Sequence, residues 1–205
     1  MKFFSLDSDF HKYGTILFDL IVLSALWFIT VFLTLGLLSP LANAAMFNSM
    51  NHTLIEEDGY MMQSYFILFK KKFFKALGLT LIGILLFGMA SFNIYTVVSG
   101  IFKASFLLPL YLLVFAEVTI IMLFASALLA ETDMTLKQLM KYGFLLSNKH
   151  ILVTLACLGS IVALGYLCVM YNPMFMLIGL APLFLLHTWL IYTKVFSKYH
   201  LDKLI

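Results

Sequence analysis

Three titratable residues lie inside long apolar stretches of this 205-residue chain: Asp19, Glu117 and His187. Titratable side chains are costly in hydrocarbon, so inside a membrane they are default candidates for ion, proton or ligand contacts. Glu117 lies near the middle of its stretch and His187 is well inside its own, so we hypothesise a contact between the two side chains. Asp19 lies nearer an end, where it is either a membrane site or a hydrated residue of the interface.

A second polar group follows the first apolar stretch, where the segment SPLANAAMFNSMN contains Asn43, Asn48 and Asn51. Amide side chains inside a membrane need hydrogen-bond partners. The same segment has small residues, among them Ala42 and Ala45, which let helices approach closely. We therefore predict a helix that other helices bury, rather than a loop or a signal-peptide cleavage site.

The motifs of common enzymes and metal sites are missing from the sequence. It has no HExxH, GxSxG, CxxC or phosphate-binding glycine loop, and its five histidines are scattered. All 13 basic residues are lysines, so no arginine is present to bind a phosphate or carboxylate through two hydrogen bonds. We expect no catalytic activity, no metal, no cofactor and no nucleic-acid partner.

The composition is that of an integral membrane protein. Hydrophobic residues make up 63% of the chain and charged residues 11%, far from the averages of soluble domains. Apolar stretches reach the roughly 20 residues that an α-helix needs to cross a bilayer, and they do not alternate as barrel strands do. We predict an all-α, polytopic membrane helix bundle with spans at about 14–35, 36–55, 76–98, 106–130, 151–171 and 174–196.

The distribution of lysines helps to decide between five and six spans, because cytoplasmic flanks of membrane proteins collect lysine and arginine. Counting residues 36–55 as a span leaves Lys103 on one side and the other 12 lysines on the opposite side. The five-span alternative moves Lys2 and Lys12 across to join Lys103, which weakens the ratio from 12:1 to 10:3. The sequence therefore favours six transmembrane helices with both termini in the cytoplasm.

A faint internal repeat supports the same count. A Pro-Leu pair occurs at Pro40, Pro109 and Pro182, and proline suits the first turn of a helix, where its missing N–H leaves no bond unmade. We therefore predict that each proline opens the second helix of a hairpin. The resulting single transmembrane domain consists of three tandem hairpins, at about 1–58, 59–133 and 134–205.

Two amphipathic segments join the predicted hairpins on the lysine side of the membrane. Residues 60–75 interleave aromatic residues with lysines, and residues 134–150 are a milder version that begins with a Thr135-x-x-Gln138 capping signature. Such helices lie in the interface, as passive anchors or as docking surfaces for another protein. The lysines expected to contact lipid or a partner are Lys70, Lys71, Lys72, Lys75, Lys137 and Lys141.

The first predicted hairpin has an Asp-Leu near its start, then Leu-Trp, Thr-x-Gly and a helix of small residues. The order of these motifs resembles that of the YesL-like family of small bacterial integral membrane proteins. The acidic turn EEDGY and the Phe-rich basic segment after it are similar to that family as well. The matching positions in the hairpin are Asp19, Leu20, Leu26, Trp27, Thr34, Gly36, Ala44 and Ala45.

The resemblance implies a function that the residues by themselves do not indicate. Members of the family are typically encoded beside carbohydrate ABC importers. The resemblance therefore implies a multi-pass accessory subunit of the bacterial plasma membrane that contacts lipids and the importer's permease subunits. The alternative is a self-sufficient small transporter or channel with a polar path near Glu117 and His187. A permease subunit itself would need a docking loop with a Glu-Ala-Ala motif, which neither connector contains.

Overall fold

The computed structural model describes residues 9–55, 61–102 and 105–199. Within these ranges the protein has seven α-helices, two short 3-10 helices and no strand. The elements are α1 (Asp9–Leu33), α2 (Ser39–Ile55), α3 (Met61–Val98), η1 (Ser105–Leu107), α4 (Leu108–Glu131), α5 (Leu136–Lys149), α6 (Ile151–Met170), α7 (Phe175–Lys194) and η2 (Phe196–Tyr199).

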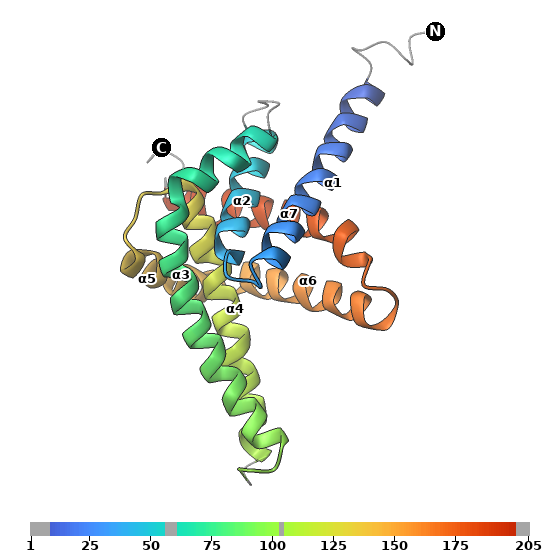
Figure 1. Ribbon diagram of the computed structural model, residues 1–205. Helices are drawn as coiled ribbons and strands as arrows, with labels where there is room; N and C mark the ends of the chain where they lie inside the picture. The colour runs from blue at the N-terminus through green and yellow to red at the C-terminus, as the bar shows by residue number, and fades with distance from the viewer. Residues whose placement is uncertain (1–8, 56–60, 103–104, 200–205) are drawn as a thin grey trace.

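The central helix of the bundle is α2, which packs against α1, α3, α4 and α7 (Figure 1). Its side chains from Leu41 to Phe47 are fully buried, with the exception of the half-buried Asn43. Ala42 and Ala45 are among the fully buried residues. The prediction that this small-residue helix is buried by its neighbours is therefore confirmed.

The turn between α1 and α2 contains the Thr-x-Gly motif. The hydroxyl of Thr34 donates to the backbone oxygen of Thr30 at 2.7 Å and accepts the backbone N–H of Leu38 at 3.2 Å. Gly36 has a φ of 82°, in the left-handed region that favours glycine. Its N–H donates to the backbone oxygen of Val31 at 2.7 Å, which closes the end of α1. Thr34 and Gly36 together end α1 and direct the chain into α2.

A long pair of helices, α3 and α4, extends away from the rest of the bundle (Figure 1). With 38 residues, α3 is about 57 Å long at 1.5 Å per residue, nearly twice the hydrocarbon thickness of a bilayer. The prediction of a separate interfacial helix over residues 60–75 is therefore wrong, because from Met61 onward this segment is the first part of α3. No proline or glycine occurs between Met61 and Lys75 to end the helix there.

The second predicted connector does form a helix of its own, α5. Its capping box is confirmed, since the backbone N–H of Thr135 donates to Oε1 of Gln138 at 2.9 Å. The chain continues into α6 and α7, which pack against each other and lie crosswise to α3 and α4 in Figure 1.

Two of the three Pro-Leu prolines lie where the sequence predicts them. Pro40 is in the first turn of α2, and Pro109 is in the first turn of α4. The prediction for Pro182 is wrong, because α7 begins at Phe175 and Pro182 lies inside it. The earlier start follows Asn172, whose Oδ1 accepts the backbone N–H of Met174 at 2.8 Å in the manner of a helix cap.

Among the described residues, four helical segments are long and apolar enough to cross a membrane: Met62–Val98, Ser105–Glu131, Ile151–Met170 and Phe175–Tyr199. A shorter apolar helix covers Phe18–Leu33. With 17 residues, α2 measures about 26 Å, slightly less than the roughly 30 Å of a hydrocarbon core. The four segments indicate a membrane protein, while the six-span count and the hairpin layout stay predictions.

Candidate functional site

The predicted polar residues Asn43 and His187 line the same cavity, which has a volume of about 510 Å³. Side chains of α1, α2, α3, α4, α6 and α7 surround it, and most of them are apolar. An apolar cavity with a few convergent polar groups is the usual form of a small-molecule site, so this cavity is the candidate functional site. Its polar lining side chains are Trp27, Ser39, Asn43, Thr119, Ser126, Cys168 and His187.

His187 lines the cavity from α7, and its side chain is fully buried. Its Nε2 lies 2.8 Å from Oγ of Ser160 on α6. The Ser160 hydroxyl also lies 2.8 Å from the backbone oxygen of Cys157, to which it can donate. The contact between His187 and Ser160 joins α6 to α7 and orients the imidazole ring beside the cavity.

Asn43 lines the cavity from α2. Its Oδ1 accepts a hydrogen bond of 2.7 Å from Nε1 of Trp27 on α1. The Trp27 ring in turn packs against Phe184 of α7, with a centroid distance of 6.3 Å. The amide therefore has the intramolecular partner that the sequence predicts, and this partner is the tryptophan of the Leu-Trp motif.

Glu117 lies outside this cavity, half-buried on α4. Its Oε1 accepts a hydrogen bond of 2.7 Å from Nδ2 of Asn148 near the end of α5. The hypothesised contact between Glu117 and His187 is wrong: within the described residues each has a different partner, Asn148 and Ser160 respectively. The sequence does not reveal the pair with Asn148, because that asparagine lies on a connector whose packing against α4 is a tertiary feature.

A second polar cluster, the Glu131 junction, consists of Asn51, Glu131 and Tyr192. The carboxylate oxygen Oε1 of Glu131 accepts hydrogen bonds from Nδ2 of Asn51 at 3.3 Å and from the hydroxyl of Tyr192 at 2.5 Å. These contacts join α2, α4 and α7. Sequence reasoning misses Glu131, because it ends an apolar stretch and so resembles an ordinary polar flank. One feature could have pointed to Glu131: it lies in the last turn of α4, where the helix dipole disfavours an acidic side chain. An acidic residue at that position therefore needs compensating contacts.

Lys72 lies inside the protein and not at a lipid surface, which corrects the prediction for this residue. Only 4% of its surface is exposed, and its Nζ donates to the backbone oxygen of Thr132 at 2.8 Å and pairs closely with the carboxylate of Asp133. Lys75 donates to the backbone oxygen of Asp133 at 2.8 Å. These contacts fasten α3 to the turn between α4 and α5. The hydrogen bond and the charge of Lys72 hold the pKa of the Asp133 carboxyl below its usual value.

The remaining predicted residues lie apart from these clusters. Asn48 on α2 donates through Nδ2 to the backbone oxygen of Ser64 on α3 at 3.5 Å. Asp19 is half-buried on α1. Four of the six predicted contact lysines are exposed and so available to lipid or a partner: Lys70, Lys71, Lys137 and Lys141.

Part of the chain matches a known protein family. Residues 20–94 match the family described as "Protein of unknown function, DUF624", a range that covers most of α1, all of α2 and most of α3. Trp27, Asn43 and Lys72 all fall within it. The match is consistent with the resemblance to YesL-like proteins. No curated protein and no solved structure matches the chain.

Proposed function

We propose that this protein is a non-enzymatic accessory subunit of a carbohydrate ABC importer in the bacterial plasma membrane, where it binds the importer's permease subunits. The DUF624 match covers the region that contains most of the YesL-like motifs, and it supports the resemblance from which the importer is inferred. In this proposal the chain crosses the membrane six times, as three hairpins, with both termini in the cytoplasm.

The observation that carries the proposal is the outward face of α5. The inward face packs on α4 through buried residues that include Leu139, Gly143 and Leu146. A Cβ atom added at Gly143 would lie 3.0 Å from the backbone oxygen of Ile121, so the two helices are in close contact. The outward face still exposes large apolar side chains beside lysines: Lys137, Lys141, Tyr142, Phe144 and Leu145.

This outward face suits a protein partner better than water alone. A surface helix typically packs its apolar face on the protein and exposes a polar face, whereas α5 has large apolar side chains on both faces. Aromatic residues are enriched in protein interfaces, and positive charges favour a partner with complementary acidic groups. The proposed docking surface therefore combines apolar and electrostatic contacts on the side of the membrane where the lysines are predicted.

Co-purification of the tagged full-length protein from native membranes in mild detergent tests the proposal. The wild-type protein should retain permease subunits, and the variant with Lys141→Glu and Phe144→Ser should lose them, since both changes alter only exposed residues of α5. The matched control carries Lys70→Glu and Lys71→Glu on the exposed surface of α3 and should retain the permeases. Failure of the wild-type protein to retain any permease would refute the proposal.

A second candidate function is a self-sufficient small transporter or channel. The cavity of about 510 Å³ favours it, because Asn43 and His187 offer polar groups within an apolar space. A solute-uptake assay with the purified protein in liposomes distinguishes the two functions. Solute uptake without any permease, reduced by the cavity-filling variant Leu183→Trp, would favour the transporter over the accessory subunit.

A further inference from the structure

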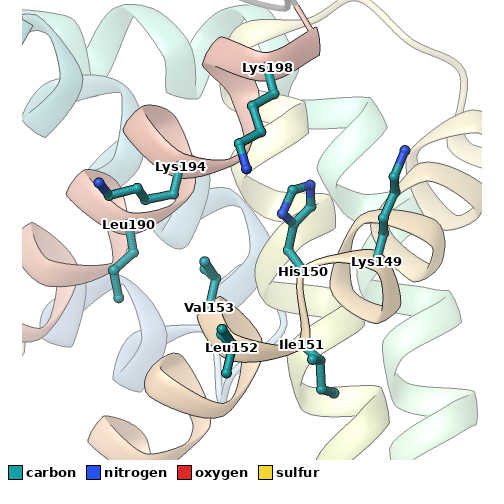
Figure 2. A pocket seen from close by; sticks show the side chains of 8 residues that line it. All are labelled: Lys149, His150, Ile151, Leu152, Val153, Leu190, Lys194 and Lys198. Atoms are coloured by element: carbon teal, nitrogen blue, oxygen red, sulfur yellow. The ribbon is translucent and has the colours of Figure 1, made fainter.

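A basic pocket of about 420 Å³ lies where α5 meets α6 and where α7 leads into η2 (Figure 2). Within the described part of the chain, its ionisable lining residues are three lysines and one histidine, and none is acidic. It is separate from the cavity that Asn43 and His187 line. The lining residues are Lys149, His150, Ile151, Leu152, Val153, Leu190, Lys194 and Lys198.

Three lysines contribute to the lining of the pocket. Figure 2 shows the amine of Lys198 turned toward the His150 ring, while Lys149 and Lys194 extend to opposite sides. Lys149 lies over the ring of Tyr199 at 5.0 Å and Lys194 over that of Trp189 at 5.5 Å. Such cation–π contacts orient an ammonium group without consuming its N–H donors. None of the three lysines forms an ion pair with a residue in the described part of the chain.

His150 adds a hydrogen-bonding group to the pocket. Its Nε2 lies 3.1 Å from the hydroxyl of Tyr199, which fixes the ring against η2. Burial and the charges of Lys198 and Lys149 lower the pKa of the imidazole below its usual 6.5. Positive potential therefore accumulates at this pocket, whose lining contains no carboxylate among the described residues, and an anion would relieve that repulsion.

The pocket adjoins an exposed apolar surface. Ile151 and Leu152 belong to its lining and are 52% and 80% exposed, and Leu155, one turn further along α6, is 56% exposed. The segment Ile151–Met170 is long and apolar enough to cross a membrane. A bound anion would thus lie beside the first turn of a helix whose exposed side chains are apolar and suited to lipid.

We propose that this pocket binds the phosphate head group of an anionic phospholipid, whose acyl chains lie along Ile151, Leu152 and Leu155. A lipid head group and a small soluble phosphate compound both carry a phosphate group that the lysines could bind. The apolar surface beside the lysines selects the lipid, because a small soluble phosphate would gain nothing from it. A lysine-rich pocket between membrane helices is suited to the anionic lipids of the cytoplasmic leaflet.

Native mass spectrometry of the full-length protein, delipidated and then titrated with phosphatidylglycerol or phosphatidylcholine, tests the proposal. The wild-type protein should bind phosphatidylglycerol in preference. Each lysine near an anionic membrane surface contributes roughly a five-fold gain in affinity. The variant with Lys194→Gln and Lys198→Gln should therefore bind phosphatidylglycerol about 25-fold more weakly than the wild type, with no change in its binding of phosphatidylcholine. The matched control with Lys137→Gln and Lys141→Gln removes two exposed lysines outside the pocket and should bind like the wild type.

Two further arms separate the possible outcomes. The variant with Lys194→Arg and Lys198→Arg keeps both charges and should retain the preference, which separates loss of charge from loss of fold. Inorganic phosphate and glycerol 3-phosphate, added in the titration range of the lipid, should not displace phosphatidylglycerol. Displacement by either compound, or equal phosphatidylglycerol binding by the wild type and the glutamine variant, would overturn the proposal.

Discussion

Replacing Asp133 by Asn should destabilise the protein more than replacing its partner, Lys72, by Met. The Lys72 ammonium is buried and has two acceptors, the backbone oxygen of Thr132 and the Asp133 carboxylate. Asp133→Asn leaves that charge without its counter-ion, and removing one partner of a fully buried pair costs about 3–5 kcal/mol. Because the Asp133 side chain is 72% exposed, water screens part of this loss, and we expect about 1–2 kcal/mol.

Lys72→Met has a smaller expected cost because it removes the buried charge itself. The methionine side chain fills most of the same space, and the main loss is one hydrogen bond to the Thr132 carbonyl, worth about 1 kcal/mol or less. The double variant should be about as stable as Lys72→Met alone, since Asp133 then has no buried partner to satisfy. The matched control is Lys70→Met, an exposed lysine two residues away, with an expected change within about 0.5 kcal/mol.

Equilibrium unfolding of the purified variants in one mixed-micelle system measures these free energies. The ion pair also predicts a pH dependence, because the pKa of Asp133 is lowered in the folded state. Its contribution is present above the ordinary value of 3.8 and is lost as the pH falls through the lower folded value. Asp133→Asn should remove this dependence. A Lys72→Met variant less stable than Asp133→Asn, or an Asp133→Asn variant as stable as Lys70→Met, would refute the reasoning.

Three further predictions concern single contacts. Tyr192→Phe removes a donor to Glu131 and should lower the free energy of unfolding by about 1–2 kcal/mol in the same micelles. Gly143→Val adds bulk against the backbone oxygen of Ile121 and should cost about 1–3 kcal/mol, with faster proteolysis of α5 than in the wild type. The pKa of His150 is lowered, so the unfolded chain takes up its proton first, and stability should fall as the pH drops below 6.5. His150→Gln should flatten that part of the stability profile.

Local features of the fold are largely predictable from the sequence. The small residues of α2 correctly indicate a buried helix, and the Thr135-x-x-Gln138 pattern correctly indicates the start of α5. Both features depend on residue size and on hydrogen bonds between neighbours in the chain. The apolar stretches likewise locate the four helices that are long enough to cross a membrane.

The errors occur where a boundary depends on more than local composition. The lysines in residues 60–75 resemble those of an interfacial helix, but composition does not end a helix, and α3 continues through them into its apolar part. Pro182 resembles a helix start, yet a proline inside a helix is tolerated in apolar surroundings where neighbouring groups satisfy the freed carbonyl. In both cases tertiary packing outweighs the local signal.

The site residues divide in a similar way. The sequence identifies Asn43 and His187 as polar groups that need a buried environment, and the structure places both on one cavity. It does not identify partners, because a partner is set by how the helices rotate and cross. Glu117 therefore pairs with Asn148 instead of His187, and Lys72 turns inward to Asp133.

The three asparagines of α2 explain how a helix of low hydropathy can occupy the centre of this bundle. Successive residues of an α-helix are rotated by about 100° around its axis. Asn48 is five residues after Asn43 and Asn51 is three residues after Asn48, so the three side chains point in different directions. Each amide consequently bonds to a different helix: Asn43 to α1, Asn48 to α3 and Asn51 to α4. Polar groups that would be costly in lipid become specific contacts once three neighbours surround the helix. Leucine at these positions would raise the hydropathy of α2 while removing the contacts that set its position, so the polarity of α2 follows from its central place.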